Sequence, residues 1–387
     1  MKSEFGDRIF TLACAPNFAC APFNDQISPE RCNQCCKTDL CNKDACMSYR
    51  GPYGFQTTMD TDQGPGVLIF KNVTTNVGAG YDHNTGYFTA KRKGLFVFTW
   101  SIQSYEESTL SVLKLNGDEK GYAKTLYRIS ASDTATSFAV LRLEYGDRVN
   151  IELIYGTVRR TSTIFTGWSQ YSTDLETVPA FYIECPSNCS SIRYPTTNNG
   201  GLFDIETNEF LIQEGYYIIY ARMDEKVVGF VLHWVDNALS NFTSTEMDAL
   251  GIMRISTSAN HPCNMYYGHY MERDFTTLPS TIPFEYATNC SDYNFEYSPN
   301  TTIILKAPVN GIYGFMIRIY ATIQDTMVAL VVDSKEMIQM KIDMGYPLGS
   351  FIFPILELKK ADEVSLFLLN GNVSTASVVG WLVSELK

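Results

Sequence analysis

Three segments of the chain begin with a glycine and continue with apolar residues at alternate positions. They start at Gly94, Gly215 and Gly311, and the first reads Gly-Leu-Phe-Val-Phe-Thr-Trp. A period of two is typical of a strand that buries one of its faces. Because a second apolar run follows each segment after about ten residues, we predict a β-rich unit that the chain repeats three times.

The ends of the predicted repeats are also similar. Each closing run has a glycine near its middle, namely Gly167, Gly268 and Gly380, and these glycines lie 101 and 112 residues apart. A further match joins Gly146-Asp147, before the run at Val149, to Ala361-Asp362 in the third copy. The constant order predicts three tandem copies of an all-β unit of about 100 residues.

The motifs of the first copy resemble those of the C1q globular-head family. The similar positions are Phe88, the run Gly94–Phe98, Gly146-Asp147 and Phe165–Trp168, and the loop Asn76–Gly86 resembles the loop that precedes that strand in the family. The third copy keeps the strand and the ending, and the second keeps little beyond the strand. The resemblance implies a ten-stranded jelly-roll β-sandwich for each copy. The domains we expect are residues 67–175, 178–275 and 284–387, after a linker at 51–66.

Heads of this family normally assemble as trimers of separate chains, so the resemblance implies an intramolecular pseudo-trimer here. Residues 67–175 carry a net charge of +2, whereas residues 176–387 carry −12. Unlike charges on the copies are compatible with pairing between them. Acidic residues that only keep the protein in solution are the alternative.

Seven of the 11 cysteines lie within residues 1–50. Such density predicts disulfides and an oxidising compartment, whereas zinc would need a second cysteine pair or a histidine, and none occurs before His83. The odd number leaves one cysteine free or available for a higher oligomer. The disulfide candidates are Cys14, Cys20, Cys32, Cys35, Cys36, Cys41, Cys46, Cys185, Cys189, Cys263 and Cys290.

The run from Cys35 to Asn42 resembles the end of three-finger domains of the urokinase-receptor type. In that family the second cysteine of the doublet pairs with the cysteine before the final asparagine. The resemblance therefore implies a Cys36–Cys41 bond and a bond from Cys35 to an earlier cysteine such as Cys14. It covers about the last half of such a domain, so we expect an incomplete fragment at the start of the chain.

Six Asn-X-Ser/Thr sequons agree with a secreted, extracellular glycoprotein. The first residues lack the apolar middle region of a signal peptide, so a signal is not present in this sequence. The glycosylation candidates are Asn72, Asn188, Asn241, Asn289, Asn300 and Asn372.

Several function classes are disfavoured. The net charge of −12 argues against nucleic-acid binding, which relies on clustered Lys and Arg. No apolar run has the roughly 18 residues that a membrane span needs. The four histidines lie in no catalytic or zinc motif, so we expect neither an enzyme nor a cofactor. Calcium is compatible with jelly-roll loops, but no ligand spacing marks a site.

The resemblance implies a lectin-like recognition protein that binds glycans or microbial surfaces in innate immunity. Aromatic and charged loop residues suit stacking on sugars. The ligand-binding candidates are Tyr81, Asp82, His83, Arg159 and Arg160. The alternative is an extracellular-matrix, adhesive or shell-associated structural protein, and a cytokine-like receptor ligand is third. A protein ligand at extracellular surfaces stays open beside the glycan.

Overall fold

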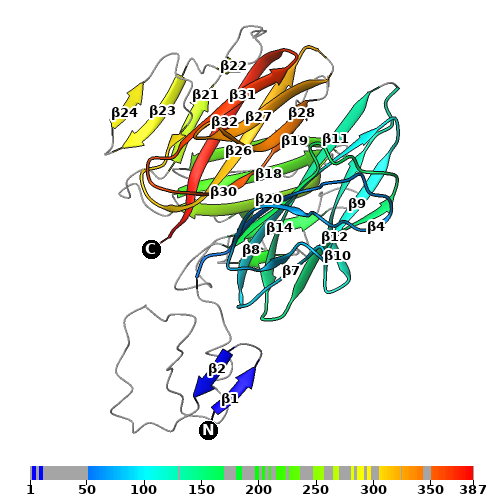
Figure 1. Cartoon of the computed structure of the whole chain (residues 1–387), viewed down its shortest axis with the longest axis vertical. Coiled ribbons are helices and arrows are strands. Elements are labelled where there is room, and N and C mark those ends of the chain that lie inside the picture. The colour runs from blue at the N-terminus through cyan, green and yellow to red at the C-terminus, as the bar shows by residue number, and fades with distance from the viewer. Residues whose placement is uncertain are drawn as a thin grey trace.

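The described part of the chain consists of strands joined by turns, without a helix. The computed structural model describes residues 2–5, 8–11, 51–129, 131–169, the strands between residues 180 and 297 with Ile282, and residues 305–323, 325–342 and 350–386. Near the N-terminus, β1 (Lys2–Phe5) and β2 (Arg8–Thr11) form an antiparallel hairpin. The strands that follow form three groups, and the pairs within each group are antiparallel (Figure 1).

Residues 53–169 form a two-layered sandwich, which we call the first sandwich. Its two layers are an inner sheet and an outer sheet. In order, the inner sheet is β11 (Ser132–Leu143), β8 (Gly94–Tyr105), β13 (Ile164–Ser169), β3 (Gly54–Thr58) and β5 (Asn72–Val77). The outer sheet is β10 (Asp118–Thr125), β9 (Thr109–Leu115), β12 (Arg148–Tyr155), β7 (Tyr87–Thr89) and β6 (Tyr81–Asp82), with β4 (Gly66–Val67) beside β12.

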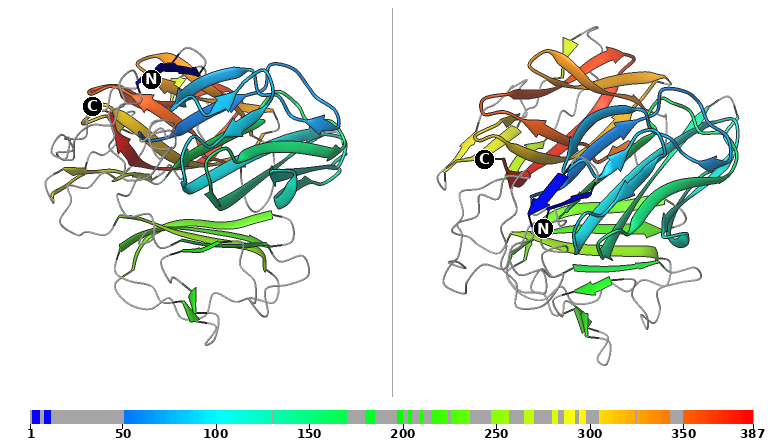
Figure 2. Two further views of the ribbon diagram at one scale, coloured as in Figure 1. Left: turned by 90° about the horizontal axis from the view of Figure 1, so that it is seen from below. Right: turned by 60° about the horizontal axis from the view of Figure 1, so that its bottom comes forward.

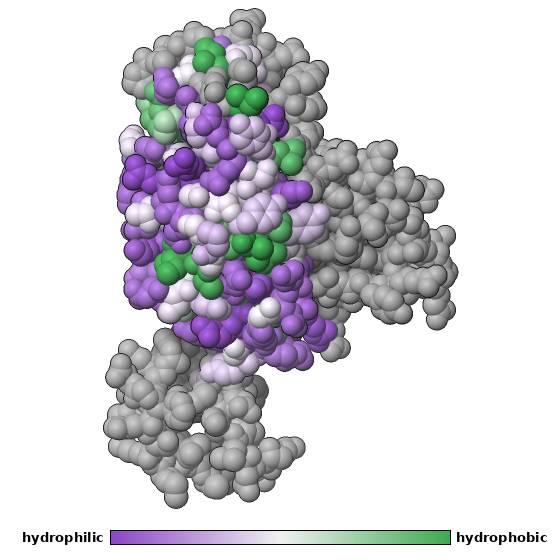
Figure 3. Space-filling model, turned by 90° about the vertical axis from the view of Figure 1, so that its right-hand side faces the viewer, coloured by the Kyte–Doolittle hydropathy of each residue, from purple (hydrophilic) through white to green (hydrophobic). Residues whose placement is uncertain are grey.

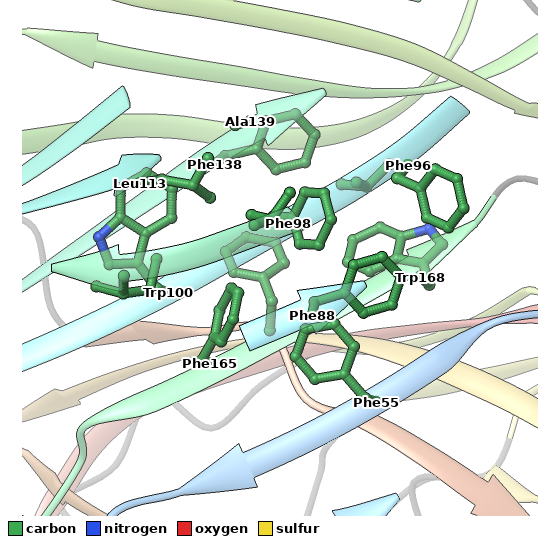
Figure 4. Close-up of a cluster of buried hydrophobic side chains, with 14 of the residues drawn as sticks. Phe55, Phe88, Phe96, Phe98, Trp100, Leu113, Phe138, Ala139, Phe165 and Trp168 are labelled. Atoms are coloured by element: carbon green, nitrogen blue, oxygen red, sulfur yellow. The ribbon is translucent and has the colours of Figure 1, made fainter. Parts of the chain in front are cut away.

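The core of the first sandwich is aromatic (Figure 4). Alternate residues of β8, Phe96, Phe98 and Trp100, point between the sheets and are at most 1% exposed. Phe55 of β3 and Phe165 of β13 pack beside them, with their ring centres 4.9 Å apart. Burying each of these rings contributes roughly 1.5–3 kcal/mol. The period of two therefore produces the buried face that the sequence predicts.

The sandwich begins earlier than the sequence analysis expected. Residues 51–66, expected as a linker, contain β3 and the start of the loop to β4. Tyr53 and Phe55 are each 1% exposed and belong to the aromatic core. The prediction of a linker was wrong because these two rings close one side of the core, although they precede the glycine-led repeat by about forty residues.

Strands near the C-terminus form a second two-layered body, which we call the C-terminal sandwich. Like the first, it has two sheets packed around an apolar cluster. Its larger sheet is β24 (Asn294–Tyr297), β23 (Tyr286–Ser291), β21 (Met265–His269), β32 (Val373–Glu385), β26 (Gly311–Ala321) and β29 (Ser350–Ile352), with β30 (Ile355–Leu358) also on β26. The smaller sheet is β22 (Ser280–Thr281), β31 (Glu363–Asn370), β27 (Thr326–Val332) and β28 (Lys335–Ile342), with β25 (Leu305–Lys306) on β31.

The part of the sequence that follows the first sandwich forms one further sheet, which we call the middle sheet. Its strands all come from residues 180–256, and a small hairpin of β16 (Phe203–Asp204) and β17 (Glu209–Phe210) accompanies it. In order, the middle sheet is β15 (Thr197–Asn199), β14 (Ala180–Glu184), β20 (Met247–Ser256), β18 (Gly215–Met223) and β19 (Lys226–Val235). Figure 2 shows it in green, as a sheet distinct from the blue-to-teal first sandwich and the yellow-to-red C-terminal sandwich.

A glycine occupies the same place in all three groups of strands. In the first sandwich Gly167 lies opposite Phe98 on one side and Phe55 on the other. A Cβ on Gly167 would come within 2.5 Å of the Phe55 ring, so the close packing of the rings requires glycine there. Gly380 lies between β26 and β21, and Gly251 lies between β18 and β14.

The expected end of the second copy is placed differently. The run around Gly268 was predicted to close the second copy, but it forms β21 and pairs with β32 of the C-terminal sandwich. The strand that takes the closing place in the middle sheet is β20, which carries Gly251. The spacing of the glycines misled the prediction because Gly268 lies in the first strand of the C-terminal sandwich, whereas Gly167 and Gly380 lie in the last strands of their units. The domain boundary expected between residues 275 and 284 consequently falls after β21, on the wrong side of it.

Candidate functional site

The two sandwiches are in direct contact, with an edge of one on a face of the other. Strand β30 lies over β3, β5 and β13, on the side of the inner sheet that faces away from the aromatic core. The residues of β8 on this side include the polar Thr99, Ser101 and Gln103, which are at most 3% exposed although alternation would direct them to solvent. The inner sheet is therefore buried on both faces, one by its own outer sheet and one by neighbouring strands.

Polar side chains of the first sandwich bind the backbone of the C-terminal sandwich. The Ile355 N–H donates to Gln56 Oε1 at 3.0 Å, and the Glu357 N–H donates to Thr75 Oγ1 at 3.3 Å. The Thr166 hydroxyl donates to the Phe353 carbonyl at 3.0 Å. These bonds satisfy backbone groups along an edge that would otherwise be unpaired, so they fix the position of the edge on the face.

Apolar contacts surround these bonds. Ile312, Phe353, Ile355 and Trp381 of the C-terminal sandwich belong to the same buried cluster as the aromatic core of the first sandwich. The ring centres of Trp168 and Trp381 are 6.0 Å apart. Contacts of this kind, apolar and buried at the centre and hydrogen-bonded at specific places, are typical of a stable interface.

A second edge-on-face contact joins the first sandwich to the middle sheet. Strand β11, the edge of the inner sheet, lies against β14, β15, β19 and β20. By strand order β11 corresponds to β29 and β30, because each of these lies beside the glycine-led strand at the same edge. The same kind of contact therefore occurs twice.

Strand β6 and the turn after it contain three of the residues predicted to bind a ligand. Tyr81 is 3% exposed, stacks on Phe55 with ring centres 5.2 Å apart, and its hydroxyl accepts from the Phe70 N–H. Burial raises the pKa of the Tyr81 hydroxyl. The prediction that Tyr81 meets a ligand at the surface was wrong, because its ring fills the core. His83 is exposed on the turn.

Asp82 is also exposed, but its carboxylate organises the turn itself. Asp82 Oδ1 accepts from the Asn84 N–H at 2.9 Å, and Oδ2 accepts from the Thr85 hydroxyl at 2.9 Å. These bonds hold the pKa of the Asp82 carboxyl below its ordinary value. The turn is thus a fixed surface feature that presents His83 at the margin of the outer sheet.

Arg159 and Arg160 lie elsewhere, on the loop between β12 and β13. The Arg159 guanidinium donates to Asp62 Oδ2 at 2.7 Å, and the Arg160 N–H donates to Asp62 Oδ1 at 2.8 Å. Burial alone would raise the pKa of the Asp62 carboxyl, but these bonds outweigh it and hold the pKa below its ordinary value. The predicted residues therefore do not form one site. Asp82 and His83 lie at one surface, Arg159 and Arg160 lie at another, and Tyr81 is buried in the core.

One predicted glycosylation site is buried. Asn372 is 6% exposed and its Oδ1 is buried, so its side chain does not reach the surface of the fold. Asn72 lies on β5 and is exposed, and its amide donates to the Met59 carbonyl. Asn289 lies on β23. The sequons Asn188, Asn241 and Asn300 lie outside the described residues.

The cysteine predictions are likewise outside the part that is described, except that Cys290 lies on β23. Within the described residues no group of three His, Cys, Asp or Glu side chains is placed to hold a metal ion. No helix of that same part is long and apolar enough to cross a membrane.

Comparison with known proteins identifies the first sandwich. Residues 53–169 match the C1q domain family model, and this part of the chain is a C1q domain. The match begins at Tyr53, in agreement with the buried ring that starts the fold.

Two curated relatives match the same part of the chain. Human complement C1q tumor necrosis factor-related protein 3 is 33% identical over 112 residues, which are 27% of this chain and 45% of the relative. Human multimerin-1 is 30% identical over 115 residues, which are 28% of this chain and 9% of the relative. The chain thus spans less than half the length of either. Among solved structures, the globular domain of zebrafish complement 1qA protein is similar with 22% identity and a TM-score of 0.28, over 32% of this chain and 100% of that one.

Proposed function

We propose that this chain is an extracellular, non-enzymatic recognition protein that holds three C1q-like units as a pseudo-trimer within one polypeptide. The observation that carries the proposal is the edge-on-face contact, which occurs once between the two sandwiches and once between the first sandwich and the middle sheet. A third contact, from the β19 edge to the larger sheet of the C-terminal sandwich, would close a ring. Short connections between the units would supply an effective concentration of order mM and remove most of the association cost.

Light scattering across a range of protein concentrations tests the assembly. We expect the mass of one chain, 43.6 kDa, at every concentration, because the interfaces are satisfied within the chain. A mass of three chains would show that C1q domains of separate molecules associate instead. The same measurement with and without a reducing agent distinguishes this association from disulfide linkage through an odd cysteine, because only the linkage is lost on reduction.

The recognition we propose includes lectin-like binding of glycans around the turn that presents His83. Support comes from the fixed Asp82 carboxylate and from Tyr87, which pairs with Asp82 across the hairpin and carries the Arg148 guanidinium 3.9 Å from its ring centre. Aromatic faces and fixed polar groups suit sugar rings. The proposal includes secretion of the protein and a role in innate immunity.

A glycan array probed with the full chain tests the lectin-like part. We expect binding to a few related sugars that His83→Ala weakens at least tenfold and that Tyr145→Ala, at an exposed position, leaves within about twofold. Binding to no sugar, together with disulfide-linked oligomers, would favour the adhesive or matrix alternative, which the seven cysteines of residues 1–50 support.

A further inference from the structure

Exposed apolar side chains gather at one end of the first sandwich. This end, which we call the loop end, contains the turn after β8, the loop between β10 and β11 and the loop between β12 and β13. Ile129 is 80% exposed and Tyr127 is 59% exposed, both on the loop after β10. The other exposed large apolar residues at this end are Tyr105, Leu126, Ile154 and Tyr155, at 36–40%. The chain enters and leaves the sandwich at the opposite end, where Tyr53 and Ser169 are hydrogen-bonded.

Seen from the side of the outer sheet, most of the described surface is hydrophilic or intermediate, with several small hydrophobic patches (Figure 3). Single exposed apolar residues are ordinary on protein surfaces, but a contiguous group marks an interaction site. Tyr145, 57% exposed on the turn before β12, lies at the opposite end, away from these residues. The loop end is therefore the place where the first sandwich offers apolar area.

Hydrogen bonds fix the loop that carries Tyr127 and Ile129. Asp133, 8% exposed, accepts from the Leu126 N–H at 2.8 Å and from the Arg128 guanidinium at 2.7 Å. The Tyr127 N–H donates to Ser108 Oγ at 2.8 Å. The loop does not need to be ordered at the moment of binding, so an apolar anchor on it loses little entropy.

Charged residues of both signs lie on the other loops of the loop end. The Arg159 guanidinium lies 5.8 Å from the ring centre of Tyr105 and also binds Asp62. Arg160 is exposed beside it, and Glu106 is exposed on the turn after β8, where its N–H donates to the Ala131 carbonyl. An apolar centre with a charged rim, rich in Tyr and Arg, is the composition of a protein-binding surface.

We propose that the loop end docks a protein partner that has an apolar pocket for Tyr127 and Ile129, and charged groups that complement Arg160 and Glu106. A sugar is a poor match for Ile129, because an aliphatic side chain has neither a ring face nor a polar group for hydroxyls. An anionic membrane is a poor match as well, because the chain carries −12 and places Glu106 in the rim. The inference rests on the recognition role proposed above and names a ligand class for this surface.

A random peptide library displayed on phage, selected against the immobilised full chain, tests the proposal. We expect enriched peptides with paired apolar residues beside a charged one, and at least tenfold weaker binding to the double variant Tyr127→Ser/Ile129→Ser. Tyr145→Ser, an exposed tyrosine at the opposite end, should leave affinity within about twofold.

Two parallel measurements separate other ligands from a protein. The same double variant is assayed on a glycan array and on vesicles of phosphatidylcholine with phosphatidylserine, and both should be unaffected. The proposal is overturned if no enriched peptide depends on Tyr127 and Ile129, or if sugar or vesicle binding falls with them. The mass of the double variant is also measured by light scattering. If it stays that of a single chain, a loss of binding is not due to a failure of the proposed assembly.

Discussion

The first sandwich and the C-terminal sandwich make the same turns with different residues. The hairpin between β9 and β10 has positive φ at Asn116 and Gly117, and the hairpin between β27 and β28 has it at Asp333 and Ser334. In each, the side chain of the first turn residue accepts a hydrogen bond of 2.9 Å from the backbone of an adjacent strand. The comparison teaches that a repeated backbone keeps its geometry while the glycine that marks it in sequence is lost.

The turn before the next strand shows the same substitution more sharply. Gly146 has φ +89° and its N–H donates to the Ala90 carbonyl at 2.8 Å. Ala361 has φ +76° and its N–H donates to the Ala307 carbonyl at 2.7 Å. An alanine in this left-handed conformation is strained, so the C-terminal sandwich keeps a turn that its sequence disfavours.

The two sandwiches differ most at the edge that corresponds to β11. In the first sandwich β11 pairs with β8 without interruption from Ser132 to Leu143. In the C-terminal sandwich Pro354 separates β29 from β30, because proline has no N–H for the ladder. The Phe353 carbonyl before this proline accepts from Thr166 of the first sandwich. The interruption therefore lies where one sandwich meets the other.

The strongest test of the comparison is in the cores. Phe98 and Phe315 lie opposite Gly167 and Gly380, and both are fully buried. We expect Phe98→Ala and Phe315→Ala each to lower the free energy of unfolding by about 3–5 kcal/mol, measured by urea denaturation. Tyr145→Ala, at an exposed position, should change it by about 0.5 kcal/mol or less. A small effect of Phe315→Ala alone would mean that the C-terminal sandwich lacks an equivalent core.

The contact between the sandwiches gives the next largest effect. Gln56→Leu removes the acceptor of the buried Ile355 N–H, so we expect a loss of about 1–3 kcal/mol in urea denaturation. The control Thr61→Val is exposed and should be close to neutral. An effect of Gln56→Leu no larger than that of the control would contradict a close interface at this place.

The strained turn sharpens the comparison with substitutions of opposite sign. Gly146→Ala should destabilise the protein by about 1 kcal/mol and Ala361→Gly should stabilise it by a similar amount, because only glycine adopts this φ without cost. A Cβ on Gly146 would meet open space, so packing does not confuse the first result. Thermal unfolding of both variants measures the difference, and equal signs would show that the two turns are not equivalent.

The smallest effect concerns pH at the loop end. The folded state holds the pKa of Asp62 below its ordinary value, so the ionised carboxylate stabilises the fold above about pH 4 and this contribution is lost as pH falls further. The stability difference between the wild type and Asp62→Asn should therefore shrink between about pH 6 and about pH 3. Urea denaturation at several pH values measures it. A constant difference would mean that the bonds from Arg159 and Arg160 do not depend on the charge.

Local pattern was enough to predict the all-β class and the buried side of β8, because the aromatic residues Phe96, Phe98 and Trp100 recur at every second position. It was not enough to predict that Thr99, Ser101 and Gln103 are buried as well, since their cover comes from strands more than 180 residues away. Polar residues at these positions predict exposure to solvent, and only the structure shows that the C-terminal sandwich covers them.

The candidate sites were predicted less well than the fold. Tyr81 and His83 are two residues apart in a polar stretch, yet one ring is in the core and the other is at the surface, because Tyr81 lies on a strand and His83 on the turn after it. The loop end was missed except for its two arginines. Tyr127 and Ile129 are ordinary strand-forming residues by type, and only the bonds to Asp133 and Ser108 show that the loop carrying them is fixed.

The two sides of the contact between the sandwiches are encoded at separate positions of one gene. Gln56, Thr75 and Thr166 are on one side, and residues 353–357 are on the other. In a symmetric homo-oligomer a single mutation is copied into every interface, so its cost multiplies with the number of subunits. Here a mutation alters one contact once, which leaves each contact free to diverge without being repeated around an axis.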